Sequence, residues 1–378
     1  MPDNTTSVSI QDRFPSAQDT RHSAQTTLHS TIHSLLPHIQ GKKVLFITTK
    51  NIDYIRNSQE LKLLQEQGAD LSVIGDRGKT YLTRLLRVYG RLLFSSFKGF
   101  DTIFVGFAPQ LIFPFIGGKL GKAFVIQDFF ISLYDTFCLD RKRFRPNSLL
   151  GRLLHKLDTY TLQKGDLILT DTKAHGDYFH QEFGADAKKL LTLYLEADTR
   201  IYYPRQSSRP DYLKDRYVVL YFGSELPLQG VEIILGAVDL LKDTTDLAFV
   251  LIGPMSNSTL PQGENIHYLN WLPQEELAVM ISYADLCLAG HFHGSIEKAR
   301  RTIPGKAYIY EAMKKPMLLG DSPANHELFT ADQYHYFVPM GNSQALADAI
   351  LLSQQALPQM KQINRQSEMG FACKKDTL

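Results

Sequence analysis

The stretch PGKAYIYEAMKKPMLLGD at 304–321 holds a cation and a carboxylate at a spacing that could do chemistry. Lys306 stands in the first turn of a predicted helix, and Glu311 follows five residues later. A cation at a helix start suits a phosphate, because the first N–H groups of a helix are unpaired. A carboxylate offers two acceptors to neighbouring sugar hydroxyls. Alternatively, Glu311 forms an ordinary surface ion pair with Lys315 at i+4.

The segment HFHGSIEKARRTIPGK at 291–306, which leads into this helix, is cationic. Against one acid, Glu297, it carries two histidines and four cations: His291, His293, Lys298, Arg300, Arg301 and Lys306. Long loops with such charge are often functional, and a cationic loop suits an anionic ligand such as a diphosphate. The alternative is a solvated run of charges without a ligand.

A Gly-Ser turn in FGSELPLQG at 222–230 follows another predicted strand. Gly223 and Ser224 end the strand, and Gln229 and Gly230 open the next helix. Backbone N–H groups freed at such a turn, together with the helix start, attract a phosphate. The alternative is a plain connection between a strand and a helix, where glycine is common.

Two aspartates, Asp128 and Asp135, lie in VIQDFFISLYDT at 125–136, after a strand of the first half. Either could orient or deprotonate a hydroxyl group of an acceptor. The alternative role is a helix cap or a loop hydrogen bond.

The elements that must position these residues alternate between strand and helix. Short apolar runs of the kind buried on both faces predict strands from 43–48 to 190–195, and again from 217–224 to 334–339. A polar, proline-containing linker at 202–215 separates the two series. Two doubly wound parallel sheets follow, with ligands expected outside the carboxyl ends of the strands and in the cleft between domains. We predict domains at 39–205 and 206–355, a disordered tail at 1–38 and a C-terminal tail at 356–378.

Several classes of protein are disfavoured. The sequence has no GxGxxG after its first strand, no GxxxxGK[ST], no GxSxG and no DxD. Dinucleotide, P-loop, nucleophile-elbow and metal-diphosphate sites therefore lack support. A net charge of +2 does not indicate nucleic acid. Three cysteines without CxxC spacing, and no signal-peptide apolar run, predict a cytoplasmic protein.

The segment KTYLTRLLRVYGRLLFSSFK at 79–98 contains no acidic residue. Arg84, Arg87 and Arg91 fall on one face of a predicted helix, with leucines around the other side. A basic amphipathic helix suits an anionic membrane surface, and RKRFR at 141–145 could extend it. This would bring the protein to the inner face of the plasma membrane. The alternative is a domain helix whose solvent face is basic.

Residues 217–350 resemble the donor-binding half of the GT-B glycosyltransferases, particularly the retaining family 4, or glycosyl transferases group 1. The matching segments occur in the family's order: YFGS, QG at 229–230, VLIG, YADLCLAG, PGKAYIYEAMKKPMLLG and ALADAI. LYLEADTRIYYP at 193–204 resembles the end of the family's acceptor domain. The resemblance implies two Rossmann-like domains facing a cleft. It also implies that Glu311 binds the ribose of a nucleotide-sugar, while Lys306, Arg300 and Arg301 bind its diphosphate.

The implied activity is transfer of a sugar from a nucleotide diphosphate sugar to a lipid-linked or polysaccharide acceptor in cell-surface glycan synthesis. The family implies retention of configuration, and we expect no metal or other cofactor. The chain departs from the family at Ser224, Gln229 and Ile303, where a cation, a lysine and a glutamate are usual. Two alternatives therefore stay open: a GT-B sugar-nucleotide epimerase or hydrolase, and an inactive GT-B binding subunit.

Overall fold

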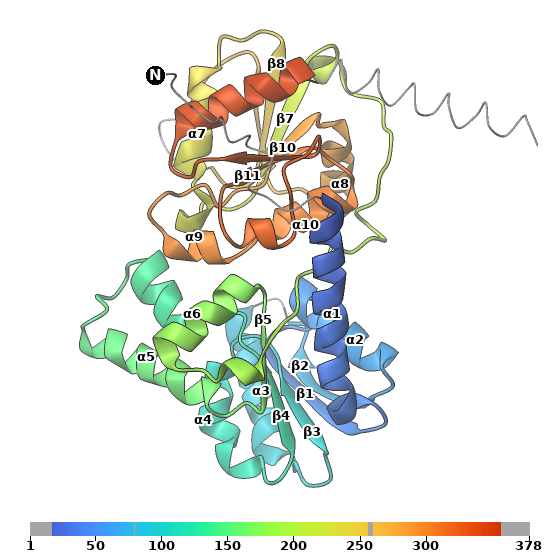
Figure 1. The fold of residues 1–378 in the computed structure, drawn as a ribbon, viewed down its shortest axis with the longest axis vertical. Helices are drawn as coiled ribbons and strands as arrows, with labels where there is room; N and C mark the ends of the chain where they lie inside the picture. The colour runs from blue at the N-terminus through green and yellow to red at the C-terminus, as the bar shows by residue number, and fades with distance from the viewer. Residues whose placement is uncertain (1–16, 79, 256–259, 357–378) are drawn as a thin grey trace, which may run out of the picture.

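Two parallel β-sheets, each covered by helices, form the two halves of the molecule (Figure 1). The computed structural model describes residues 17–78, 80–255 and 260–356. Each sheet has six strands, in the orders β2-β1-β3-β4-β5-β6 and β12-β11-β10-β7-β8-β9. The predicted α/β class with two doubly wound sheets is confirmed.

The first sheet is built from short apolar strands whose burial explains their composition. Its strands are β1 (Lys43–Asn51), β2 (Asp70–Asp76), β3 (Thr102–Val105), β4 (Phe124–Asp128), β5 (Leu167–Thr170) and β6 (Leu190–Thr192). Its helices are α1 (Ala17–Ile39), α2 (Ile55–Glu66), α3 (Tyr81–Phe94), α4 (Phe113–Ile116), α5 (Leu149–Leu162) and α6 (Lys173–Phe183). Val44, Phe46 and Ile47 of β1 are fully buried. Burial on both faces favours such continuous apolar runs in parallel sheets.

The second sheet repeats this arrangement. Its strands are β7 (Tyr217–Phe222), β8 (Leu247–Ile252), β9 (Ile266–Leu269), β10 (Leu286–Leu288), β11 (Met317–Gly320) and β12 (His335–Val338). Its helices are α7 (Val231–Leu240), α8 (Gln274–Tyr283), α9 (Glu297–Arg301) and α10 (Gly305–Ala312), and a last helix covers 343–356. Apolar clusters pack on both faces of the sheet. Because β10 pairs with β7 in parallel, the carboxyl ends of both strands lie at the same edge of the sheet, where Gly223 and Gly290 follow them.

The predicted disorder at 1–38 is wrong for the residues that the structure describes, because residues 17–39 form α1. Leu28, Leu35 and Ile39 recur on one face of this helix, and the last two are fully buried. The Thr31 hydroxyl donates to the Thr192 carbonyl at 2.7 Å. Helix α1 packs against both β6 and the short turn η8 (Asn325–Glu327), and so runs along both domains (Figure 1). Residues 1–16 and the predicted tail at 357–378 lie outside the described residues.

The chain crosses between the domains through an ordered segment. Tyr194, Tyr202 and Leu213 are buried in the apolar core of the second domain. Arg209 forms an ion pair with Asp285, with Nη2 and Oδ2 2.7 Å apart. The predicted polar linker at 202–215 is therefore packed against the domain that it introduces.

Two of the three arginines of α3, Arg87 and Arg91, stay exposed, and all three contact the end of β2. Arg84 is buried and donates to the Gly78 carbonyl at 2.5 Å. Arg87 contacts Asp76 at 3.3 Å, and Arg91 donates to the Gly75 carbonyl at 2.7 Å. These side chains bind the end of β2 because carbonyl and carboxylate oxygens are available there.

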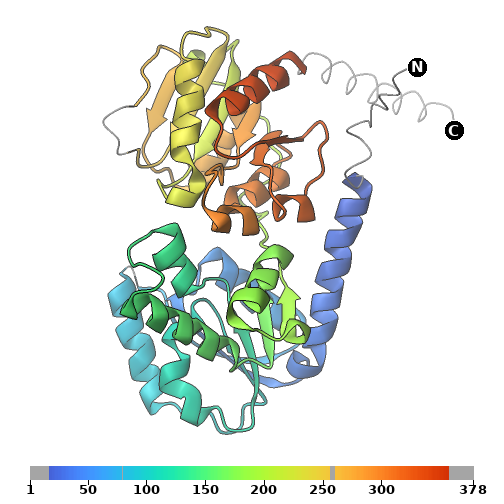
Figure 2. The same ribbon diagram turned by 60° about the vertical axis from the view of Figure 1, so that its left-hand side comes forward.

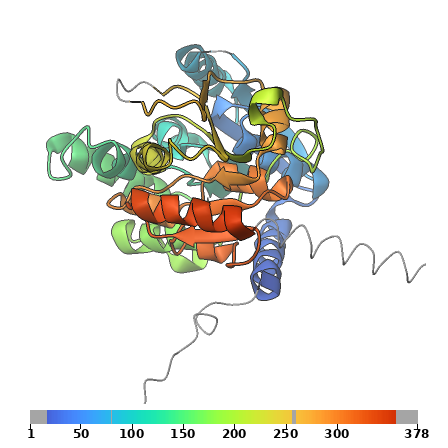
Figure 3. The same ribbon diagram turned by 90° about the horizontal axis from the view of Figure 1, so that it is seen from above.

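Helices α1 and α5 lie on opposite sides of the first domain, and α5 projects at the edge of the molecule (Figures 1 and 3).

Across the described part of the chain, none of the helices has the length and apolar character needed to cross a membrane.

Candidate functional site

Four of the predicted donor-binding residues meet at the carboxyl ends of β7 and β10. We call Gly223, Gln229, Gly230 and Lys306 the cradle. The Lys306 ammonium donates to Gln229 Oε1 at 2.5 Å. A Cβ on Gly223 would lie 3.3 Å from Lys306 Nζ, so this glycine lets the backbone approach the cation. Ser224 continues the same turn, and its carbonyl accepts the Leu226 amide at 2.8 Å.

The turns around the cradle require glycine. Gly290, which follows β10, has a φ of +85°, and a Cβ there would lie 2.3 Å from Gln229 Oε1. Gly230 has a φ of +65°, and a Cβ there would lie 2.5 Å from the His293 amide nitrogen. Side chains rarely adopt positive φ, so both positions favour glycine. Gly230 is the N-cap of α7, which leaves the first N–H groups of that helix at the cradle.

Lys306 lies in a buried position, where a positive charge loses the stabilisation that water provides. Only 7% of the residue is exposed, and its Nζ lies 5.0 Å from the centre of the Tyr221 ring. Burial lowers the pKa of Lys306 to about 7. An anion placed beside the ammonium would offset this desolvation, because opposite charges attract strongly where water is excluded. The cradle therefore suits a phosphate group.

His291, which the sequence grouped with the cationic loop, is a neutral member of the site. It is buried, has a φ of 60°, and its Nδ1 lies 3.0 Å from the Thr302 carbonyl. Burial, and then the Lys306 charge, lowers the pKa of His291 to about 3. This imidazole can hydrogen-bond a ligand but adds no positive charge at neutral pH.

Arg301 lies in a different place from its predicted role. Its Nη2 lies 3.0 Å from Asp135 Oδ1 in the first domain, and its guanidinium lies 3.7 Å from the centre of the Tyr178 ring. Its carbonyl accepts the Thr172 hydroxyl at 2.5 Å. Arg301 therefore joins the two domains, and its binding of the diphosphate stays a prediction. Arg300 is half-buried beside it, and its carbonyl accepts the Ala324 amide at 3.3 Å.

The two predicted acceptor bases are both in buried ion pairs. Asp128 ends β4, is fully buried and contacts Arg56 with both oxygens, at 2.8 and 3.2 Å. Glu60 lies 3.5 Å from the same guanidinium. Asp135 is fully buried and contacts Arg301, as described above. Both side chains make the structural contacts that were the alternative role, and a role as the acceptor base stays a prediction.

A further carboxylate of the first domain, which the sequence analysis did not single out, is buried near residues of the second domain. Asp171 follows β5, is 5% exposed, and its Oδ1 lies 2.6 Å from Nδ1 of the fully buried His175. The negative charge of Asp171 raises the pKa values of Tyr308 and Glu327, both from the second domain, although burial is the larger cause. Its position after a strand end was the available signal, because DLILTD at 166–171 has the length of a buried strand.

Glu311 lines a pocket of about 980 Å³ between the domains. Residues of the first domain, including Asp53 and Gln59, lie on its wall together with Tyr308 and Glu311 of α10. Glu311 lies off the buried stripe of α10, as expected, and its side chain is 41% exposed. Lys315 instead donates to the Ser282 and Ala284 carbonyls, at 2.6 and 2.8 Å. The alternative of a surface pair with Lys315 is therefore wrong.

His335 holds one oxygen of Glu311. Its Nε2 lies 2.9 Å from Glu311 Oε2, and its Nδ1 lies 3.0 Å from Asp332 Oδ1. Burial lowers the pKa of His335, but the two carboxylates outweigh burial and raise it to about 9. The imidazolium therefore fixes the orientation of Glu311 toward the pocket at neutral pH.

Comparisons with solved structures define the class of fold. HepE from Anabaena, in complex with UDP, superposes with a TM-score of 0.58 at 14% identity, covering 83% of this chain and 90% of that chain. Sucrose-phosphate synthase from Thermosynechococcus elongatus gives 0.59 at 12% identity, covering 84% and 90%. A glycosyltransferase from Rickettsia africae gives 0.53 at 12% identity, covering 90% and 86%. The chain has the GT-B fold of these glycosyltransferases.

The second domain also matches a family model. Residues 216–353 match the family model of the glycosyl transferases group 1. This range contains the whole cradle and Glu311. No curated protein matches the chain at a significant level.

Proposed function

We propose that this protein transfers a sugar from a nucleoside-diphosphate sugar to a lipid-linked or polysaccharide acceptor in cell-surface glycan synthesis. The observation that carries the proposal is the cradle, where a buried lysine and a helix start meet at the strand ends of a domain that matches the group 1 family model. HepE was solved with UDP, and also with UDP-glucose, which supports a nucleotide-sugar as the donor.

In this proposal the diphosphate lies in the cradle. Lys306 and the first N–H groups of α7 stabilise the charge that grows on the departing diphosphate, which is the largest electrostatic demand of the reaction. Glu311, held by His335, accepts hydrogen bonds from the ribose hydroxyls in the pocket between the domains.

The remaining parts of the proposal follow from the resemblance. Transfer proceeds with retention of configuration and uses neither a metal nor another cofactor. We place the protein in the cytoplasm, which the free thiols of Cys138 and Cys287 support. Donor titration in the presence of a chelator tests the metal-free part of the proposal.

Calorimetric titration with UDP-glucose and other nucleotide-sugars tests the donor site. Glu311→Ala should weaken binding of the tightest donor by ~1.5–3 kcal/mol, the range for hydrogen bonds to a charged group. Glu66→Ala is the matched control, because Glu66, the last residue of α2, is an exposed glutamate whose ion pair with Lys62 spans 3.8 Å. Unchanged donor affinity in a folded Glu311→Ala variant would remove Glu311 from the site.

Product analysis separates the transferase from its rivals. Incubation of the bound donor with water as the only acceptor should release little free sugar if transfer is the activity. Rapid release would indicate a hydrolase, and a changed sugar on the same nucleotide would indicate an epimerase. Absence of binding to every nucleotide-sugar would contradict the donor site itself.

A further inference from the structure

A pocket of about 570 Å³ lies at the amino ends of β3 and β4, where Thr102 and Phe124 begin these strands. The carboxyl ends of the same sheet lead to the second domain, because Asp135 after β4 and Thr172 after β5 both contact Arg301. The connections that form the pocket therefore lie at the end of the first domain that points away from the second domain (Figure 2). The proposed sugar transfer uses no residue of this end.

Cations dominate the lining of this pocket, which we call the amino-end pocket. Four lysines and one acid line it: Lys42, Lys98, Lys119, Lys122 and Asp101. Asp101 Oδ2 accepts the Lys43 amide at 2.9 Å, so this carboxylate holds the start of β1. A concave surface with one dominant sign of charge and apolar walls concentrates ions of the opposite sign. The amino-end pocket therefore attracts anions.

Two contacts satisfy the helix ends that would otherwise disfavour an anion here. The Lys119 ammonium donates to the Leu92 and Leu93 carbonyls at the end of α3, at 2.7 and 2.8 Å. The Thr102 hydroxyl donates to the His38 carbonyl in the last turn of α1, at 2.5 Å. Carbonyl groups at a helix C-terminus carry partial negative charge, and these donors offset it.

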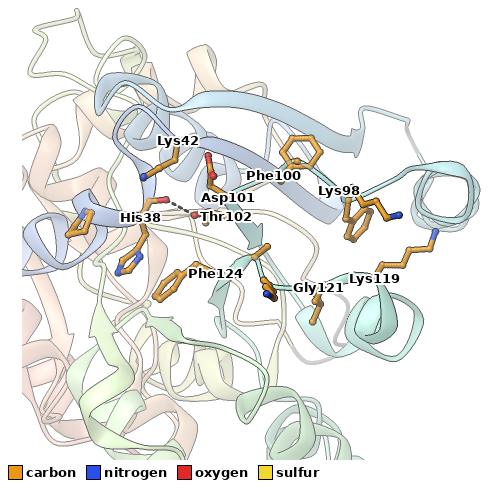
Figure 4. Close-up of a pocket in the computed structure, with 15 residues that line it drawn as sticks. His38, Lys42, Lys98, Phe100, Asp101, Thr102, Lys119, Gly121 and Phe124 are labelled. Atoms are coloured by element: carbon orange, nitrogen blue, oxygen red, sulfur yellow. Dashed lines mark hydrogen bonds between the residues drawn. The ribbon is translucent and has the colours of Figure 1, made fainter.

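Three of the lysines keep an uncompensated charge. Lys42, Lys98 and Lys122 are exposed, and within the described part of the chain none of their ammonium groups pairs with a carboxylate. Lys42 and Lys98 lie at opposite ends of the pocket (Figure 4). A ligand that reaches both ends therefore needs more than one anionic group.

Aromatic rings form the apolar part of the lining. The rings of His38 and Phe124 stack, with centroids 3.5 Å apart and 6° between their planes. Burial lowers the pKa of His38 more than the Asp166 charge raises it, so this ring is neutral at neutral pH. Phe100 and Phe124 are half-buried, which leaves part of each ring open to a ligand. Sites for small molecules combine such walls with a few charged groups, in volumes of about 300–1,000 Å³.

We propose that the amino-end pocket binds a small organic polyphosphate, a soluble molecule with two or more phosphate groups on a body that carries a ring. The phosphates accept charge-assisted hydrogen bonds from Lys42, Lys98 and Lys122. The body packs against Phe100 and Phe124. A single phosphate would leave one end of the pocket without a counter-charge. This site is separate from the cradle and does not depend on the proposed sugar transfer.

Calorimetry and hydrogen exchange of the full chain test this site, with ATP and inorganic tripolyphosphate as the probes. Both probes should slow the exchange of amides at 97–102 and 119–124, because these segments line the pocket. Inorganic monophosphate should bind at least about tenfold more weakly than tripolyphosphate, because it cannot bond to both ends at once. High salt should weaken all three.

Charge variants identify the residues. Lys98→Gln with Lys122→Gln should weaken tripolyphosphate binding at least about tenfold, because two charge-assisted hydrogen bonds are lost. Lys156→Gln with Lys188→Gln is the matched control, because both are exposed lysines of the same domain and their removal changes the net charge equally. Lys306→Met should keep the binding, since the cradle belongs to the other domain.

Thermal unfolding of each variant verifies that it is folded, and the exchange pattern of the wild-type protein needs no variant. Absence of protection at 97–102 and 119–124 with both probes would overturn the proposal. An equal loss of binding in the control pair would also overturn it, because the effect would then be one of net charge. So would loss of binding in Lys306→Met, which would assign the probes to the cradle. Failure of UDP to bind would contradict the cradle alone.

Discussion

Burial of Lys306 sets the electrostatics of the cradle. Its pKa of about 7 means that the free protein loses the ammonium charge as the pH rises through neutrality. A diphosphate beside Nζ favours the charged form and raises this pKa again. Binding of an anion is therefore coupled to uptake of a proton above about pH 7.

This coupling predicts a calorimetric signature. At about pH 8, binding of UDP to the wild-type protein should take up a substantial fraction of one proton, because most free Lys306 is neutral there. Near pH 6 the uptake assigned to Lys306 should vanish, because the lysine is already charged. The measurement is the binding enthalpy in two buffers of different ionisation enthalpy.

Lys306→Met should abolish the uptake at the higher pH and weaken UDP binding. In turnover, it should lower kcat at least as much as it raises KM, because the charge on the leaving diphosphate grows in the transition state. Lys314→Met is the control, since Lys314 is an exposed lysine beyond the end of the same helix. Proton uptake that persists in Lys306→Met would assign the signal to another group.

The predicted residues differ in how far the sequence around them indicates their contacts in the fold. Lys306, Gln229 and Gly223 were predictable as one site because each follows a strand of the same sheet, and parallel strands end at one edge. Arg301 and Asp128 were not, because their partners, Asp135 and Arg56, lie 166 and 72 residues away in the chain. A charged residue looks the same in sequence whether it binds a ligand or a distant carboxylate.

At the scale of elements, the strands were predictable and one helix, α1, was misjudged. Continuous apolar runs such as YVVLYF have few alternatives to a buried strand. Helix α1 was predicted to be disordered because most of its residues are polar, and only Leu28, Leu35 and Ile39 mark its apolar face. Helix α3 was correctly predicted, but its orientation depends on the oxygens that end β2. Tertiary contacts decide such orientations, and periodicity alone does not.

The ion pair of Arg56 and Asp128 anchors α2 to β4. Arg56 also donates to the Leu193 carbonyl just after β6, so one guanidinium joins three elements. Burial, followed by the Asp128 charge, raises the pKa of Glu60 well above its usual value. Asp128 is therefore the principal counter-charge, and Glu60 is the group that can replace it.

Asp128→Asn should lower the free energy of unfolding by roughly 3 kcal/mol, near the lower end for breaking a buried pair, because Glu60 can ionise in its place. Chemical denaturation at neutral pH measures this loss. Asp53→Asn is the control, because its pair with Arg77 is exposed and worth less than about 1 kcal/mol. Wild-type stability combined with abolished turnover would restore Asp128 as a catalytic residue.

At the scale of the whole molecule, side chains near the cleft fasten the two domains to each other. Glu327 of the second domain accepts the Lys173 and Ala174 amides at the start of α6, both at 2.8 Å. The Tyr194 hydroxyl donates to the same carboxylate at 3.0 Å. Lys298 donates to the Thr136 hydroxyl at 2.9 Å, close to the pair of Arg301 and Asp135. These contacts join the second domain to the start of α6 and to the segment around Asp135 of the first domain.

Glu327→Ala should therefore loosen the arrangement of the domains without damaging either one. The first amides of α6 lose a charged acceptor worth ~1.5–3 kcal/mol, so their hydrogen exchange should quicken by about tenfold or more. Exchange measured by mass spectrometry over 171–180 reports this change, and small-angle scattering reports any opening. UDP affinity should stay near wild type, because the cradle belongs wholly to the second domain. Transfer should slow, because the first domain, where we expect the acceptor, is displaced relative to the donor. Glu182→Ala is the control, since Glu182 contacts His155 within the first domain at 3.2 Å. Unchanged exchange at α6 in Glu327→Ala would show that the domains are held together by other contacts.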